Sequence, residues 1–164
     1  MTQPLPFVCQ ERVRWADVDL VGIMRFSAFT RMVELAEQEL LRAAGMPYDE
    51  IFENPTFWMP RRHLSIDYLA PAQIDELLTL TVYVSRLGTT SMTMTIDMYA
   101  DARRTLVASA AMVVVCVDRA HFQKQPLPAA MQAGLAPFAC SQEAARAWYA
   151  RGQEDSSAAR LGDG

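Results

Sequence analysis

Two carboxylates, Asp17 and Asp19, lie in a D-x-D-x-x-G loop that ends at Gly22, directly before a stretch with helical spacing. The first turn of a helix presents unpaired N–H groups and the positive end of its dipole, which can polarise a carbonyl or hold an oxyanion. A carboxylate beside such a pocket can attack that carbonyl or activate water against it. The spacing therefore indicates chemistry at a carbonyl group. The alternative, commoner for an isolated acid such as Asp19, is a loop residue that only hydrogen-bonds nearby backbone N–H groups.

The helix after the loop is predicted over residues 27–44. Ser27 has the residue type of an N-cap, whose hydroxyl oxygen accepts a hydrogen bond from a helix-start N–H. Gly45 and Pro47 mark the end, because glycine suits the left-handed residue after a helix and proline prevents continuation. Apolar residues at helical spacing form one face, namely Phe29, Met32, Val33, Ala36, Leu40 and Ala43. The other side carries Arg31, Glu34, Gln38 and Arg42.

Alternating apolar and polar residues predict strands over 7–15, 57–69, 75–85, 92–99 and 106–117. A helix followed by four strands in hairpin order specifies an α+β domain, with an antiparallel sheet curled around the helix. We expect one domain over residues 1–137 and a C-terminal extension over 138–164, helical at 142–151 and disordered from 154. Unprotected sheet edges favour self-association into a homodimer or a homotetramer.

The composition excludes several classes of protein. The net charge of −4 argues against general nucleic-acid binding, and the longest apolar run, residues 108–117, is too short for a membrane span. The first residues show no secretory signal, so we expect a cytoplasmic protein. Three widely spaced cysteines and two histidines indicate neither a disulfide framework nor a metal site. We expect no metal, no membrane and no nucleic-acid partner.

With these pieces placed, the sequence resembles the hotdog-fold acyl-CoA thioesterases, in the branch of 4-hydroxybenzoyl-CoA thioesterase and its YbgC-type relatives. The resemblance covers roughly residues 8–130. It rests on five segments in the family's order, R-W-A-D-V-D-L-V-G-I-M at 14–24, R-M-V-E-L-A-E-Q-E-L-L-R-A-A-G at 31–45, S-I-D-Y-L-A-P-A-Q-I-D-E-L-L at 65–78, R-L-G-T-T-S at 86–91 and A-M-V-V-V-C-V-D at 111–118. It implies a hotdog fold and hydrolysis of an acyl-CoA thioester to a carboxylic acid and coenzyme A, without a cofactor.

The resemblance also assigns residues. Asp19 matches the family's catalytic aspartate, acting as nucleophile or general base, and Gly22 matches the glycine that turns the loop into the substrate pocket. The backbone N–H groups of Phe26, Ser27 and Ala28 fall where the family polarises the thioester carbonyl. The thioester would then lie with its pantetheine arm along a subunit interface.

Asp17 is expected to support the site, either by bracing the loop or by tuning Asp19 as a nearby like charge. Many relatives carry His, Tyr or Asn at the position of Phe26, so a helper side chain is missing here. Two alternatives to acyl-CoA hydrolysis stay open. One is hydrolysis of an acyl group on a carrier protein, which shares the pantetheine arm, and the other is an acyl-CoA-binding module without turnover.

Cationic side chains lie at predicted strand ends and turns. Each alone is ordinary solvated surface, but a subset of them could hold the phosphates of coenzyme A. The set comprises Arg61, Arg62, Arg86, Arg103 and Arg104. His63 is expected at the surface or an interface, and Cys116 in the core. Met92, Met94 and Met98 are expected to fill the core or an interface.

Overall fold

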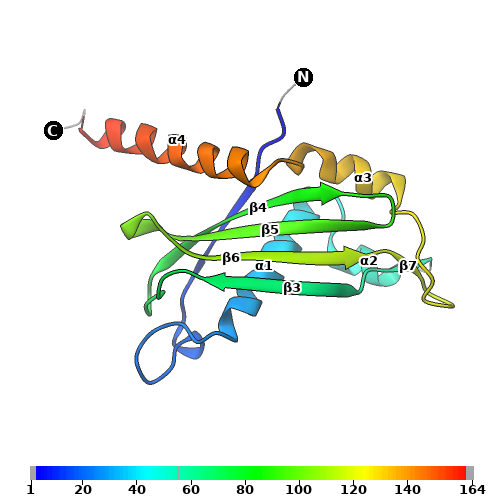
Figure 1. The fold of residues 1–164 in the computed structure, drawn as a ribbon, viewed down its shortest axis with the longest axis horizontal. Coiled ribbons are helices and arrows are strands. Elements are labelled where there is room, and N and C mark those ends of the chain that lie inside the picture. Colours follow the sequence, from blue (N-terminus) through cyan, green and yellow to red (C-terminus); the bar gives the residue numbers. More distant parts are fainter. Residues whose placement is uncertain (1–2, 55, 162–164) are drawn as a thin grey trace.

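The computed structural model describes residues 3–54 and 56–161. Its centre is helix α1, Ala28–Ala43, behind a five-stranded antiparallel sheet (Figure 1). The strands lie in the order β1-β4-β5-β6-β3. Their bounds are β1 Phe7–Arg12, β4 Leu77–Leu87, β5 Ser91–Ala100, β6 Thr105–Val115 and β3 Arg61–Tyr68. The predicted α+β architecture, a helix wrapped by an antiparallel sheet, is confirmed. The predicted hairpin order is wrong for β3, which pairs with β6 at one edge while β4 pairs with β1.

The predicted apolar stripe of α1 is buried against the sheet. Met32, Ala36 and Leu40 are fully covered and belong to one core cluster with Leu80 and Met98. Leu80 and Met98 are register partners in β4 and β5, so their side chains meet α1 on the same face of the sheet. Burial of this stripe supplies most of the helix's stability, since isolated helices of this length are marginal in water.

The predicted side-chain cap of α1 is wrong. Ser27 occupies the N-cap position, but its hydroxyl makes no capping hydrogen bond. Its backbone is already helical, with φ −69° and ψ −23°, whereas a capping side chain acts from an extended residue. The carbonyl of Ser27 instead accepts a hydrogen bond from Thr30 Oγ1 at 2.6 Å.

Two predicted strands are interrupted. Residues 57–69 form a short β2, Phe57–Trp58, and then β3, with Met59 and Pro60 between them. Residues 106–117 likewise divide into β6 and β7, Val117–Asp118, and β7 pairs with β2 in a second sheet. Pro60 has no N–H to donate to a ladder, which explains the first break. The short helix α2, Tyr48–Glu53, lies between α1 and β2.

The first predicted strand ends early, at Arg12, because residues Trp15–Asp17 form the 3-10 turn η1. The turn is closed by Asp17 N donating to Arg14 O at 2.9 Å. At the same end of the sheet the β5–β6 connection forms a second 3-10 turn, η2, Asp101–Arg103. These turns bring the acidic loop and the start of α1 to one end of the sheet.

The C-terminal extension contains α4, Gln142–Leu161, which packs on the sheet face opposite α1. It is preceded by α3, Ala129–Leu135, whose Gly134 lies against Ala44 at the C-terminal end of α1, and by η3, Ala136–Phe138. Arg146 in α4 forms two hydrogen bonds with the fully buried Asp97 of β5, at 2.9 and 3.0 Å, and Tyr149 stacks on Tyr99 with ring centroids 3.8 Å apart. Figure 1 shows α4 running past β4 and continuing beyond the sheet.

Helix α4 is longer than the sequence predicts. Its helical conformation runs to Leu161. The disorder expected from residue 154 stays a prediction, and residues 162–164 lie outside the described residues. The stretch after Gly152 contains alanine, glutamate and arginine, which are good helix formers and extend a helix already anchored at Arg146. No helix in the described part of the chain is long and apolar enough to span a membrane.

Candidate active site

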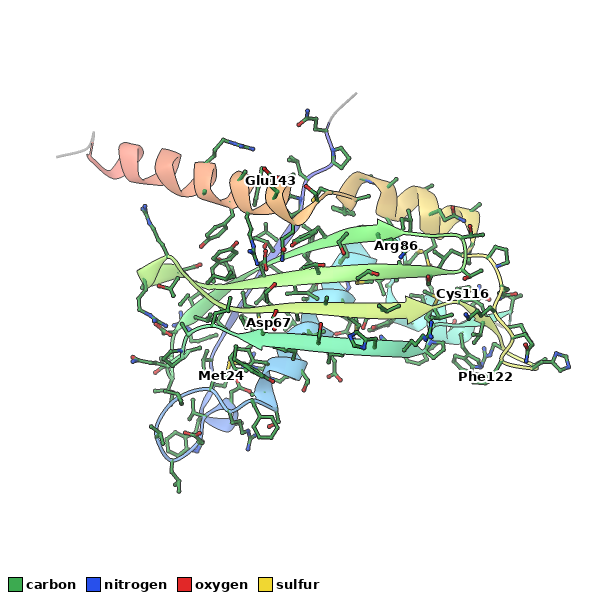
Figure 2. The ribbon with its side chains drawn as sticks, in the orientation of Figure 1. Met24, Asp67, Arg86, Cys116, Phe122 and Glu143 are labelled. Atoms are coloured by element: carbon green, nitrogen blue, oxygen red, sulfur yellow. The ribbon has the colours of Figure 1, made fainter. Side chains whose placement is uncertain are left out.

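The loop that carries Asp19 is folded tightly onto itself. Asp19 N donates to Ile23 O at 3.1 Å, Gly22 N donates to Asp19 O at 3.0 Å, and Val18 bridges Met24. Gly22 has a φ of +80°, a conformation that a residue with a Cβ rarely adopts. The sequence-predicted role of Gly22 in turning the loop therefore has a backbone reason. Figure 2 shows Met24 at this end of the molecule and Phe122 at the opposite end.

The side chain of Asp19 is exposed in the single chain, and only one of its two carboxylate oxygens is engaged. Oδ1 accepts the N–H of Val21 at 2.9 Å, the short-range bond expected of a loop acid. Within the described residues Oδ2 has no hydrogen-bond partner, and Asp19 has no ion-pair partner. The carboxylate is thus oriented by one oxygen. Asp19 lines a hollow of about 510 Å³ together with Trp15, Val18, Leu20, Gly22 and Ile74.

Asp17 has the contacts of a structural brace. It is buried, and its two oxygens receive Arg31 Nε at 2.9 Å and Arg31 Nη2 at 2.5 Å. Arg14 N donates to the same carboxylate at 2.9 Å. Burial raises the pKa of Asp17, but the hydrogen bonds from Arg31 and Arg14 and the charge of Arg31 outweigh it and hold that pKa below its ordinary value. Asp17 is therefore a paired anion, unavailable as a base.

The resemblance assigns carbonyl polarisation to the N–H groups of Phe26, Ser27 and Ala28, and two of these three have no acceptor in the described part of the chain. Ala28 N donates to Arg25 O at 2.9 Å, which closes the turn before the helix. Within the described residues no acceptor is found for the N–H groups of Phe26 and Ser27. These two groups and the helix dipole can polarise a carbonyl oxygen, whereas the N–H of Ala28 is already engaged.

An apolar groove of about 490 Å³ adjoins the helix start. Its lining is Ile23, Met24, Phe26, Phe29, Tyr68, Leu69, Ala70 and Pro71. The rings of Phe29 and Tyr68 meet edge to face at 5.1 Å, while Phe26 is 75% exposed. The groove and the hollow beside Asp19 are lined by consecutive residues, Gly22 and Ile23, so they are neighbours along one loop.

The five arginines proposed for coenzyme A do not gather in one place on a single chain. Arg103 and Arg104 lie at the β5–β6 turn, near the acidic loop, and Arg61, Arg62 and Arg86 lie at the other end of the sheet. Figure 2 shows Arg86 at the end opposite Met24. A phosphate site using both groups needs more than one chain.

Two of these arginines are held by buried or bidentate partners. Arg61 Nη2 contacts Glu37 at 2.5 Å and also binds the hydroxyl of Tyr48, and Glu37 is only 2% exposed. Arg103 makes a bidentate pair with Glu76 at 2.7 and 2.8 Å and donates to Pro71 O. In the part of the chain that the structure describes, Arg62 and Arg86 have no ion-pair partner.

The helical spacing predicts Arg31 on the solvent side of α1 and assigns no role to Glu37. The burial of Glu37 could have been predicted, because Glu37 follows Val33 and Ala36 at the spacing of the apolar stripe. The pairing of Arg31 could not have been predicted, since its partner Asp17 is fourteen residues away in sequence. Among the other expectations, Cys116 and the methionines at 92, 94 and 98 are buried in the core. His63 is exposed on the edge strand β3.

Comparison with known proteins identifies the family. The chain matches the thioesterase-like superfamily over residues 13–135, most of its length. It belongs to this superfamily. A 1,4-dihydroxy-2-naphthoyl-CoA hydrolase from Nostoc punctiforme is 27% identical over 124 residues, which cover 76% of this chain and 82% of the relative. The acyl-CoA thioester hydrolase YbgC of Escherichia coli O157:H7 is 26% identical, covering 71% and 86%.

Solved structures agree on the fold. The crystal structure of Slr0204, a 1,4-dihydroxy-2-naphthoyl-CoA thioesterase from Synechocystis, superposes with a TM-score of 0.75 at 25% identity, covering 79% of this chain and 94% of that one. The gentisyl-coenzyme A thioesterase BH1999 has a TM-score of 0.70 at 18% identity, a likeness of fold alone. The hotdog fold expected from the sequence is confirmed. The superfamily match ends at Leu135, so η3 and α4 lie beyond it.

Proposed function

We propose that this protein hydrolyses acyl-CoA thioesters to a carboxylic acid and coenzyme A. The proposal is supported by its membership of the thioesterase-like superfamily and by relatives named as acyl-CoA thioester hydrolases. The observation that carries it is the pairing, along one loop, of an exposed Asp19 with one unpartnered oxygen and two unpaired helix-start N–H groups. An acid and two N–H donors are what attack at a thioester carbonyl requires.

The carbonyl oxygen of the thioester accepts hydrogen bonds from the N–H groups of Phe26 and Ser27, which stabilise the negative charge that develops on it. As a general base, Asp19 takes a proton from water while the water oxygen bonds to the carbonyl carbon. The C–S bond then breaks, the coenzyme A thiolate leaves and takes up a proton, and the carboxylic acid is released.

As a nucleophile, Asp19 would instead bond to the carbonyl carbon itself and expel the thiolate. The mixed anhydride so formed is then cleaved by water, which restores the carboxylate. Both routes need an uncoordinated carboxylate oxygen, and Oδ2 of Asp19 meets that need. Both also release one thiol and one carboxylic acid for each thioester.

Hydrolysis of an acyl group on a carrier protein is the second candidate, because the reacting groups and the pantetheine arm are the same. An acyl-CoA-binding module without turnover is the third. The apolar side chain of Phe26, 75% exposed beside the helix start, favours this third reading, since it can neither donate nor accept a proton.

We also propose that the protein acts in the cytoplasm as a homodimer or a homotetramer. Support for self-association comes from the edge strand β3, whose backbone and apolar side chains are open in the single chain, with Leu64 40% and Tyr68 53% exposed. The loop adds Trp15 at 83% and Leu20 at 107% exposure, a large apolar area beside the reacting groups. A second copy that covers β3 would shield both the open edge of this strand and the apolar side chains of the loop.

Coenzyme A phosphates remain assigned to cationic side chains, of which Arg62 and Arg86 are the best placed. Neither has an ion-pair partner in the described part of the chain, so either can meet a phosphate without first breaking an internal contact. Arg61 and Arg103 would have to share their guanidinium groups with Glu37 and Glu76.

The test compares Asp19→Asn with Asp17→Asn. The amide at position 19 keeps the size of the side chain but can neither attack nor accept a proton, so kcat should fall about a hundredfold or more. Acyl-CoA binding, followed by calorimetry, should persist because the N–H groups are untouched. Asp17→Asn should reduce turnover less, through loop order. Near-normal thiol release by Asp19→Asn would refute the assignment of Asp19.

A further inference from the structure

Arg31 joins three segments that are separate in sequence. It is the fourth residue of α1, its guanidinium forms a two-bond fork with Asp17 of η1, and its Nη1 lies 3.4 Å from Glu11 Oε1 of β1. Arg14 Nε donates to the same Glu11 oxygen at 2.8 Å. The helix start, the loop start and the end of the first strand therefore meet at one guanidinium.

The position of Arg31 works against helix stability on its own. A cation in the first turns of a helix opposes the positive end of the helix dipole. The unfavourable charge is offset by Asp17, whose side chain is 5% exposed while that of Arg31 is 36% exposed. A lysine would supply the charge but not the planar fork that occupies both oxygens of the carboxylate. The two-bond contact between Arg31 and Asp17 therefore connects the acidic loop to the start of α1.

The two ends of this connection lie beside the two parts of the reacting machinery. Asp19 follows Asp17 by two residues, and the N–H groups of Phe26 and Ser27 precede Arg31 by five and four. The backbone between them is held as well, because Arg25 N donates to Asp17 O at 2.9 Å. The Asp17–Arg31 pair therefore determines how far the attacking carboxylate stands from the oxyanion donors.

We propose that Arg31 is a positioning residue for thioester hydrolysis, acting through Asp17 to hold Asp19 in register with the helix-start N–H groups. The inference rests on the proposed function. Arg31 does not touch the reacting atoms in this account; its effect is geometric. Displacement of reacting groups by about 1 Å can reduce a rate about a hundredfold, so loss of the fork should be felt in kcat.

The experiment measures kcat and KM for Arg31→Met, Arg31→Lys, Asp17→Asn and the double variant Asp17→Asn/Arg31→Met. We expect kcat to fall about tenfold to a hundredfold in Arg31→Met with KM changing less than about threefold, and Arg31→Lys to recover part of the loss. The double variant should be no slower than the slower single variant, because both changes break one pair. Arg42→Met, on the exposed side of the same helix, should match wild type.

Hydrogen exchange of the same proteins gives a readout that does not depend on turnover. In Arg31→Met, exchange should quicken over residues 17–27 and stay at wild-type rates in β4 and β5. Unchanged exchange there, or a kcat like that of Arg42→Met, would overturn the positioning role. An equal loss of kcat and gain in KM, with general loosening of the fold, would also overturn it. A wild type that binds acyl-CoA without releasing thiol would refute the proposed function, and the exchange result would still decide for or against the Asp17–Arg31 clamp.

Discussion

Removal of Arg146 should destabilise the protein by detaching α4 from the sheet. Asp97 is fully buried, and its carboxylate receives Arg146 Nε at 2.9 Å, Arg146 Nη2 at 3.0 Å, Ser109 Oγ at 2.6 Å and Tyr83 OH at 3.3 Å. Arg146→Ala deletes the two charged donors and leaves a buried anion with two hydroxyls. Arg146 is the one cation that pairs with Asp97 among the described residues, and removing one partner of a buried ion pair strongly lowers the free energy of unfolding because the remaining charge is uncompensated.

The expected loss of unfolding free energy is about 3 kcal/mol. Breaking a fully buried pair by removing one partner costs about 3–5 kcal/mol, and hydrogen bonds to charged groups are worth about 1.5–3 kcal/mol each. The lower end applies because the side chain of Arg146 is 40% exposed, so water can reach Asp97 once the arginine is gone. Urea unfolding followed by circular dichroism measures the difference.

Matched variants separate the pair from the helix. Arg151→Ala, an exposed change two residues beyond Tyr149, should unfold like wild type. Asp97→Asn in the Arg146→Ala background should recover part of the loss, because a neutral amide needs no cation. If Arg146→Ala unfolds at the same urea concentration as Arg151→Ala, the buried pair does not hold α4 and the reasoning fails.

Three further predictions concern binding, assembly and pH. Acyl-CoA affinity should weaken as salt rises, and Arg62→Ala or Arg86→Ala should raise KM more than they lower kcat; calorimetry showing salt-independent binding would contradict this. Light scattering should give at least twice the 18.4 kDa of one chain, and a stable monomer at micromolar concentration would contradict the covered β3 edge. The pKa of Asp17 lies below its ordinary 3.8, so its stabilisation is complete above pH 3.8 and disappears as the pH falls through the lower folded-state pKa. The stability gap between wild type and Asp17→Asn should therefore be constant near neutral pH and close in strong acid, and a gap that persists there would contradict the ion pair.

The hydrophobic periodicity of the sequence predicts most of the helices and strands of the fold. The helix predicted over 27–44 is found at Ala28–Ala43, because its apolar stripe is continuous and Gly45, with φ +80°, ends it as expected. Strand pairing was only partly predictable, because β4, β5 and β6 pair in hairpin order but β3 pairs with β6 and β4 pairs with β1. Strand ends were less predictable, since a single residue such as Pro60 breaks a ladder that the hydrophobic pattern continues through.

The arrangement of the site could be predicted only in part from the sequence. The loop acid and the helix start adjoin in sequence, so their proximity could be predicted. The partners of Asp17 and Asp97 could not, because Arg31 and Arg146 lie fourteen and forty-nine residues away and no local pattern links them. The engagement of Ala28 N by Arg25 O was also hidden, since it depends on the backbone angles of the turn rather than on residue type.

The most direct test of the central claim is thiol release by the wild-type protein from short-chain, long-chain and aromatic acyl-CoAs, with free carboxylic acid quantified in parallel. We predict that at least one thioester yields thiol and acid in equal amounts, and that Asp19→Asn loses this turnover while still binding the same acyl-CoA. Binding of acyl-CoA by the wild type with no thiol release from any of the three classes would contradict hydrolysis and identify a binding module instead.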